Sequence, residues 1–280
     1  MTRVKVVTDS SSGLPKELEK QYDITVVPIP IQIGEESYKE KVNLSPEELY
    51  RLLDGRVMPK TSSPSPGDFV EVYSQLASEA SDIISIHVTA KGSGTCQSAI
   101  VAADSVADRV KVHVYDSNTV SMGTGFLSIE AAKAALDGLT LEQIRQRLDA
   151  IRDKIRAFVA LPTLRYLQRS GRLNRGQAIF GSLLSIKPVI EVRDGILEVV
   201  DRVRSYPKAL ERVVELAAEA VSRFPSRVAV MHGNSPEEAQ RFAEQIKKRI
   251  RVRQLIVAEV GASLAVHGGP GMIGVVLSPD

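Results

Sequence analysis

The sequence has a single cysteine, Cys96, no tryptophan, and no apolar run close to the roughly 20 residues that a membrane-spanning helix needs. A lone cysteine excludes an intramolecular disulfide framework and suits a reducing compartment. The opening MTRVKVVTDSSS lacks the apolar core of a secretory signal peptide. These absences predict a soluble, cytoplasmic protein without integral membrane contact.

The sequence also lacks an excess of either charge, because its 36 Lys and Arg residues and 34 Asp and Glu residues give a net charge of +2. Proteins that neutralise nucleic-acid phosphates usually carry a clear basic excess. We therefore expect no nucleic-acid partner. The 280 residues, 43% hydrophobic and 25% charged, are typical of a globular chain with one large or two ordinary domains.

The first half of the chain alternates strand and helix patterns. Strands are predicted at about 4–7, 83–88 and 110–115. Residues 26–33 are also strand-like, and Pro28 and Pro30 suggest an edge position or irregular pairing for them. Ser45 and Ser65, each followed by proline and then an acid at the third helical position, predict helices over about 46–53 and 67–80. Further helices are expected at about 95–107, 125–136 and 140–156. This alternation indicates a parallel sheet covered on both faces.

The second half has a different pattern. Asp194-Gly195 between two apolar runs predicts a hairpin over 189–192 and 196–200 with a type I′ turn. Helices are expected at about 207–223 and 236–249, with strands at 227–231, 254–260 and 272–277. We therefore predict an α/β protein of two domains, an N-terminal parallel-sheet α/β domain over 1–158 and a smaller C-terminal α+β domain over 159–280.

Hydroxyl side chains gather in turns that follow predicted strands of the first half. These turns are Thr8-Asp9-Ser10-Ser11, Thr61-Ser62-Ser63 and Gly92-Ser93-Gly94-Thr95. The carboxyl ends of parallel strands share one edge, where helix N-termini favour a carboxylate or phosphate and hydroxyls can donate to it. Each turn alone is more often an ordinary helix cap. Together they favour an anion-binding edge.

Several enzyme signatures are missing. Gly269–Gly274 fits G-x-G-x-x-G literally, but neither a helix nor an acid about 20 residues further on follows. There is no P-loop, no G-x-S-x-G around Ser93, and no pair of histidines spaced for zinc, so no metal site is expected. His267 could act as a base to Ser93 or Thr61, although no third member is evident. A Ser/His lipid hydrolase therefore stays open as the alternative.

The segment RYLQRSGR places Arg165, Arg169 and Arg172 on one face if it is helical. Such a face is either solvated or a docking surface for an acidic partner, because arginine is enriched at interfaces. The sequence leaves both readings open.

Motifs spread over nearly the whole chain resemble the DegV family of bacterial fatty acid-binding proteins. In order they are TDSSSGLP at 8–15, TSSPSPGDF at 61–69, SGT at 93–95, YDSNTVSMGTG at 115–125, YLQRSGR at 166–172, LLSIKP at 183–188 and HGGPG at 267–271. One motif alone is weak evidence. Their presence together and in order is highly specific.

The resemblance implies a long-chain fatty acid bound between the two domains. It implies that Thr61 and Ser93 hold the carboxylate, that His267 lies close to this head group, and that Ser62, Gly94 and Thr95 support the site. No cofactor other than the fatty acid is expected, and no catalytic activity of the chain itself. Uncharged donors would avoid the desolvation cost of a buried lysine.

Some members of the family present the fatty acid to a separate ATP-dependent fatty acid kinase, which makes an acyl-phosphate for phospholipid synthesis. The resemblance places the docking side for such a kinase at Arg169, Arg172 and Arg202. A purely regulatory interaction protein is a third class, which would carry no lipid.

Overall fold

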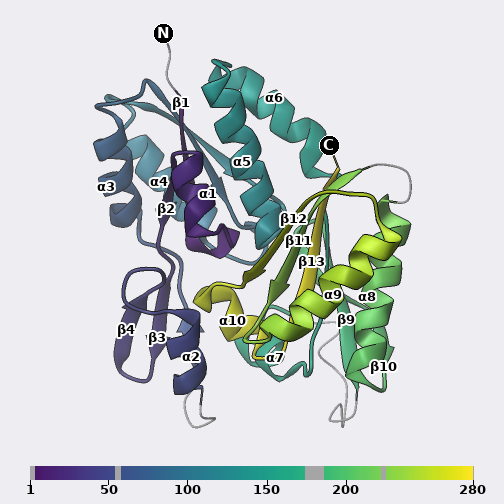
Figure 1. The fold of residues 1–280 in the computed structure, drawn as a ribbon. Coiled ribbons are helices and arrows are strands. Elements are labelled where there is room, and N and C mark those ends of the chain that lie inside the picture. Colours follow the sequence, from purple (N-terminus) through teal and green to yellow (C-terminus); the bar gives the residue numbers. More distant parts are fainter. Residues whose placement is uncertain (1–3, 54–57, 174–185, 222–224, 280) are drawn as a thin grey trace.

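The computed structural model describes residues 4–53, 58–173, 186–221 and 225–279, and its strands form three sheets (Figure 1). The first sheet has four parallel strands in the order β2-β1-β6-β7. Their bounds are Val4–Asp9 for β1, Ile24–Val27 for β2, Asp82–His87 for β6 and Lys111–Asp116 for β7. The predicted parallel sheet is confirmed.

Helices cover both faces of the first sheet. Side chains on β6 alternate, so that Ile83 packs with Phe69 of α3 on one face while Ile84 and Ile86 pack with Phe126 of α5 on the other. The helices of this half are α1 Lys16–Gln21, α3 Pro66–Leu76, α4 Thr95–Ser105, α5 Met122–Leu136 and α6 Leu141–Arg152. The capping box predicted at Ser65 is formed.

A small antiparallel sheet in the order β4-β3-β5 extends from the first half. Its strands are β3 Pro30–Ile33, β4 Glu36–Lys39 and β5 Lys60–Thr61, and helix α2 Pro46–Leu52 precedes β5 in the chain. The strand expected over 26–33 is paired irregularly, because it is divided between β2, at the edge of the first sheet, and β3 of the small sheet. The chain leaves β2 after Val27 and enters β3 at Pro30, because the intervening prolines interrupt backbone hydrogen bonding.

The second half forms a six-stranded sheet in the order β10-β9-β8-β13-β11-β12. All of its pairings are antiparallel except that of β11 with β12. The strands are β8 Arg156–Ala160, β9 Lys187–Arg193, β10 Ile196–Val203, β11 Ser226–His232, β12 Val252–Glu259 and β13 Ile273–Pro279, with helices α8 Tyr206–Val221 and α9 Pro236–Arg249 along one face (Figure 1). The predicted hairpin is confirmed, since Asp194 and Gly195 both have positive φ.

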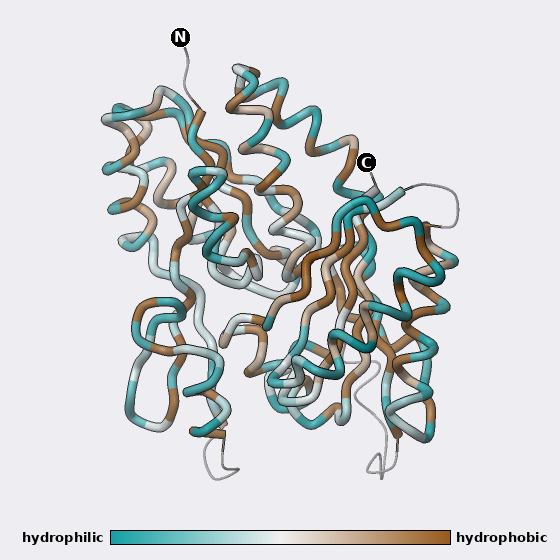
Figure 2. The backbone as a smooth tube through the Cα atoms, viewed as in Figure 1, coloured by the Kyte–Doolittle hydropathy of each residue, from teal (hydrophilic) through white to brown (hydrophobic). Residues whose placement is uncertain are grey.

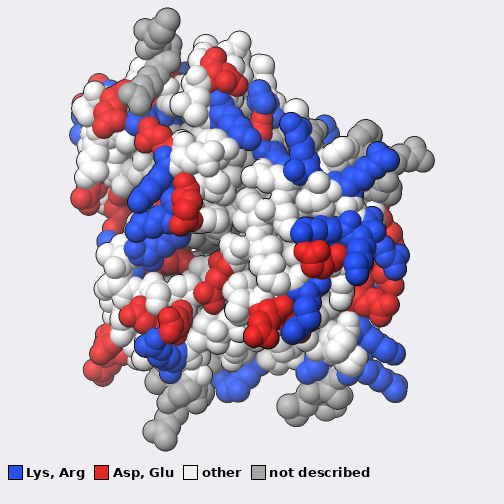
Figure 3. Space-filling view, viewed as in Figure 1, with Lys and Arg blue, Asp and Glu red and all other residues white. Residues whose placement is uncertain are grey.

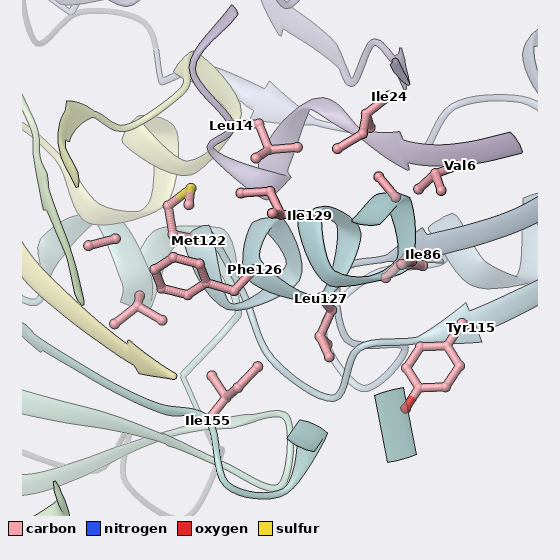
Figure 4. Close-up of a cluster of buried hydrophobic side chains, with 14 of the residues drawn as sticks. Val6, Leu14, Ile24, Ile86, Tyr115, Met122, Phe126, Leu127, Ile129 and Ile155 are labelled. Atoms are coloured by element: carbon pink, nitrogen blue, oxygen red, sulfur yellow. The ribbon is translucent and has the colours of Figure 1, made fainter. Parts of the chain in front are cut away.

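Helix α5 lies between the two large sheets. It contacts β1 and β6 on one side and β13 on the other, and most of its residues are buried. In Figure 4 Val6, Ile24 and Ile86 lie on one side of this helix, and Ile155 lies on the other. A helix that is apolar around its circumference is one that is covered on all sides. The two large sheets therefore share one continuous core.

Strand β8 starts at Arg156, so the helix expected over 140–156 ends earlier, at Arg152. The division at residues 158 and 159 stays a prediction, and β8, which spans this position, pairs with β9 and β13. Residues 183–185 of the LLSIKP motif lie outside the described residues.

Three short elements lie where the sheets meet, namely the 3₁₀ turn η1 Ser10–Ser12, α7 Arg165–Ser170 and α10 Ala262–Gly268.

Figure 2 shows apolar colour concentrated on the central strands, while Figure 3 shows acidic and basic side chains interspersed on the same face. Within the described ranges no helix is both long and apolar enough to cross a membrane.

Candidate ligand-binding site

A cavity of about 650 Å³ lies between the carboxyl edge of the first sheet and the inner face of the second. Loops after β1, β6 and β7 contribute Ser11, Ser93 and Ser121, while the second sheet contributes apolar residues such as Phe158 and Val276. The volume is in the range of small-molecule sites, and an apolar wall with a few polar groups is typical of them.

Thr61 and His267 meet at this cavity. The Thr61 hydroxyl oxygen lies 3.0 Å from Nε2 of His267, although the two residues are 206 positions apart. Sequence reasoning placed Thr61 at the edge of the parallel sheet, which is wrong, because Thr61 belongs to β5 of the small antiparallel sheet. It nevertheless lines the same cavity as Ser93.

The imidazole of His267 is neutral at pH 7. Burial, and to a smaller extent the charge of Arg172, lower its pKa to about 4. Nδ1 is buried and has no hydrogen-bond partner among the described residues. In the tautomer that carries its proton on Nε2, the ring donates to Thr61 Oγ1 and leaves the Thr61 O–H free to donate to a ligand.

Ser93 is oriented by its neighbours. Its Oγ lies 2.8 Å from Oγ1 of Thr95, which is the first residue of α4, and accepts from the Thr95 N–H at 3.3 Å. Ser63 Oγ lies 3.5 Å away. A Cβ on Gly94 would stand 3.1 Å from Ser63 Oγ, so glycine lets the two loops approach. The segment 61–63 therefore joins the site, with Thr61 at His267 and Ser63 at Ser93.

The supporting residues expected from sequence take different places. Ser62 lines the cavity, whereas Gly94 and Thr95 stand behind Ser93. Ser63 was named only as part of the Thr61-Ser62-Ser63 turn and was not predicted to be a site residue, although the run of hydroxyl residues in TSSPSPG could have identified it.

A buried carboxylate fixes the two strand ends beneath the site. Asp9 accepts from the backbone N–H groups of Ser11 and Val88, both at 3.1 Å, and lies 3.0 Å from Nδ1 of His87. Burial opposes ionisation, yet the hydrogen bond and charge of His87, with the Ser11 and Val88 bonds, hold the Asp9 pKa below its usual value. Ser11 and Val88 both line the cavity. The Asp9 contacts therefore shape its wall.

Glu40, after β4, fixes the helix that carries His267. Its carboxylate accepts from the Ser10 hydroxyl and, at 3.2 Å, from the backbone N–H of Ser263 in the first turn of α10. Burial raises the Glu40 pKa, and these hydrogen bonds act in the opposite direction. A carboxylate at a helix N-terminus stabilises that helix. Nothing in the sequence links residues 40 and 263.

Two cationic residues, Lys91 and Arg172, also line the cavity. The expectation that Arg172 shares a helical face with Arg165 and Arg169 is wrong. Helix α7 ends at Ser170, and Gly171 then turns the chain with a φ of 71°. Arg169 on α7, Arg172 after it and Arg202 on β10 are all exposed.

In the part of the chain that the structure describes, no group of three or more His, Cys, Asp or Glu side chains could hold a metal ion.

Comparison with known proteins identifies the family. The family model described as "Uncharacterised protein, DegV family" matches residues 3–280. A DegV domain-containing protein of Caldanaerobacter subterraneus subsp. tengcongensis is 35% identical over 276 residues, which cover 98% of each chain. A fatty acid-binding DegV family protein from Thermus thermophilus superposes with a TM-score of 0.93 at 30% identity, and DegV from Bacillus subtilis, a fatty acid-binding protein, with 0.92 at 32%; both alignments cover 100% of each chain. The chain belongs to the DegV family.

Proposed function

We propose that this protein binds a long-chain fatty acid, with the carboxylate at Thr61 and Ser93 and the acyl chain in the apolar cavity. One observation carries the proposal, namely that both hydroxyls and the neutral His267 line a single apolar cavity of about 650 Å³. The two proposed domains, 1–158 and 159–280, meet at this cavity. The relatives from Thermus thermophilus and Bacillus subtilis, which bind fatty acids, support this assignment.

The cavity wall supplies the affinity. Each methylene group moved from water into an apolar environment contributes about 0.8 kcal/mol, so a chain of about 16 carbons gains more than 10 kcal/mol before the costs of association are subtracted. The polar side chains at the head-group end of the cavity then need only to orient the carboxylate. Three side chains serve this role, because His267 donates to Thr61, Thr61 donates to one carboxylate oxygen, and Ser93 donates to the other.

The head group is close to cationic charge as well as to neutral donors. Arg172 lines the cavity and influences the pKa of His267, so its field also reaches the proposed carboxylate position. The guanidinium is exposed, and water screens it. It therefore attracts the carboxylate without clamping it, and the carboxylate stays able to react.

This arrangement supports presentation of the fatty acid to a separate cytoplasmic fatty acid kinase. Arg169 and Arg202 are exposed on α7 and β10. Leu167 of α7 packs in one cluster with Ile190 of β9 and, on β10, Leu197, which ties the two arginine-bearing elements together. We propose that these arginines contact acidic groups of the kinase.

The geometry favours binding over hydrolysis by a Ser/His pair. The Nε2 atom of His267 is bonded to Thr61 rather than to Ser93. The other ring nitrogen has no partner among the described residues, so the acid that orients a catalytic histidine is not part of this arrangement. Incubation with an acyl ester separates the two functions, because turnover abolished by Ser93→Ala would establish a hydrolase.

Native mass spectrometry of the purified chain tests ligand binding directly. We expect a bound fatty acid, and we expect Thr61→Val and Ser93→Ala each to weaken its affinity by about tenfold or more, since a hydrogen bond to a charged group contributes about 1.5–3 kcal/mol. Ser105→Ala on α4, whose exposed hydroxyl donates to the Val101 carbonyl oxygen, is the matched control. Undiminished affinity in the double variant would refute the proposed head-group site.

A second experiment tests presentation to the kinase. Arg169→Glu and Arg202→Glu are expected to retain fatty acid binding and to abolish acyl-phosphate formation by a cognate kinase. Arg172→Glu is expected to impair both, because Arg172 also lines the cavity. If the first two variants support full acyl-phosphate formation, these arginines are only surface charge.

A further inference from the structure

One glycine lies inside a strand of the cavity wall. Among the strands in the described part of the chain, only β13 contains a glycine, and this residue, Gly274, lines the cavity. Strand β13 is in the interior of the six-stranded sheet, between β8 and β11 (Figure 1). Glycine weakens such a strand, because it has no side chain to pack and loses more backbone freedom on folding than other residues.

The backbone does not require glycine at residue 274. Gly269 and Gly271, in the turn before β13, have φ of 75° and 80°, a conformation that favours glycine, whereas Gly274 is not among the residues with positive φ. The neighbouring atoms also leave room for a side chain. A Cβ at this position would stand 3.4 Å from the Phe158 carbonyl oxygen and 3.6 Å from Cβ of Val159, which are ordinary contacts. The fold by itself would therefore accept alanine here.

A side chain at residue 274 would point into the cavity. Side chains alternate along β13, so that Val275 packs in the cluster with α8 and α9, while Val276 faces the other way and packs in the cluster with α5. Gly274 is on the same face as Val276. Its direct neighbours across the sheet are Val159 of β8 and Met231 of β11, and both line the cavity. This row of the wall therefore lacks its central side chain.

The gap over Gly274 has the width of one hydrocarbon chain. Neighbouring strands lie about 4.8 Å apart, so the side chains of Val159 and Met231, two strands apart, start about 9.6 Å from each other. Carbon atoms in contact are separated by about 3.5–4.0 Å. A single row of methylene groups between these two side chains can therefore touch both of them, and a second row would not fit beside it.

We propose that Gly274 is a specificity-determining position of the acyl-chain site, where methylene groups of the fatty acid lie directly against the β13 backbone. This inference rests on the proposed fatty acid binding and extends it to the acyl chain. It accounts for a glycine that neither the backbone conformation nor the packing of the protein requires. Any side chain at this position takes space from the ligand, one carbon atom in alanine and three in valine.

Competition binding on delipidated protein tests the role of Gly274, with dodecanoic, hexadecanoic and octadecanoic acids as the probes. One methylene group more or less in an apolar pocket changes binding by about 10–200-fold. We therefore expect the affinity for octadecanoic acid to fall about tenfold in Gly274→Ala and further in Gly274→Val. The affinity for dodecanoic acid should fall less, because a shorter chain leaves part of the cavity unfilled and can avoid the new side chain.

Thermal unfolding of the same variants separates this role from a structural one. Gly274→Ala should unfold at a temperature no lower than the unaltered protein, because alanine restricts the unfolded chain and meets only ordinary contacts in the folded one. Gly67→Ala on α3 is the matched control. Gly67 also lacks a positive φ, its added Cβ would meet only Ser65 Oγ, at 3.6 Å, and it does not line the cavity, so fatty acid binding should not change.

Three results would decide against these inferences. If folded Gly274→Ala and Gly274→Val bind octadecanoic acid as tightly as the unaltered protein, the acyl chain does not lie against Gly274. If they lose the same factor for all three acids, Gly274 does not determine chain-length preference. Both results refute the specificity role while fatty acid binding stands. If the unaltered protein binds no fatty acid, the proposed function fails and the role of Gly274 fails with it.

Discussion

Acidification should weaken this fold in part through the buried imidazole of His267. His267 has a pKa of about 4 in the folded protein against 6.5 for a free side chain, chiefly because burial disfavours its charged form. The unfolded chain therefore takes up the proton first. The stability that the neutral imidazole provides is present above about pH 6.5 and is lost as the pH falls towards 4.

The size of the effect follows from the two pKa values. Between pH 7 and pH 5 the unfolded chain becomes almost fully protonated at His267, while the folded protein stays about nine-tenths neutral. At about 1.36 kcal/mol per pKa unit, over about 1.5 units, this costs about 2 kcal/mol. That is a large part of the stability of an ordinary domain.

Urea unfolding at pH 7 and pH 5 measures the loss, with His267→Gln as the comparison because an amide keeps a polar group without titrating. The unaltered protein should lose about 2 kcal/mol more than the variant, and the subtraction removes the contributions of the other histidines. Delipidated protein must be used, because a bound carboxylate would stabilise the charged imidazole. Equal losses in both proteins would refute the reasoning, as would an NMR titration of His267 near pH 6.5.

Two further substitutions test the frame around the cavity. Asp9→Asn should lower the unfolding free energy by about 1–3 kcal/mol, since an amide cannot accept hydrogen bonds at both of the positions that the buried carboxylate uses. Asp153→Asn on the surface should change the unfolding free energy by less than about 1 kcal/mol. Similar urea midpoints for the two variants would contradict the role given to Asp9. Gly195→Ala and Gly138→Ala both place an alanine at positive φ, but only at Gly195 would the added Cβ stand 2.2 Å from Thr89 Oγ1. Gly195→Ala should therefore lower the midpoint of thermal unfolding more than Gly138→Ala does. Equal shifts of the unfolding midpoint in the two glycine variants would show that the turn at Gly195 moves enough to accommodate the added Cβ, and would contradict this prediction.

Sequence patterns were sufficient for the elements whose signals are local. The capping boxes at Ser45 and Ser65 and the Asp194-Gly195 turn were predicted and are formed, because each depends on residues within one turn of chain. The split of 26–33 between two sheets was missed, since its apolar pattern is the same for one strand as for two. Helix α10 was also missed, because it is one short segment set off by glycines.

The residues of the candidate site were likewise predicted where a local motif identifies them and missed where only tertiary contacts do. Thr61, Ser93 and His267 were singled out from motifs, and the structure brings them to one cavity. Their supports could not be found in this way. Glu40 reaches Ser263 across 223 positions, and only tertiary packing places a carboxylate there. Periodicity likewise put Arg172 on a helix, although Gly171 ends that helix one residue earlier.

The position of β13 has a consequence for how the protein is made. This strand follows all the others along the chain, yet it lies between β8 and β11 and supplies Gly274, Val275 and Val276 to the cavity wall. Pairings over such long sequence separations form slowly. During synthesis the wall is therefore closed only when residues 273–279 have emerged and paired. The apolar cavity is therefore complete only after β13 has paired with β8 and β11.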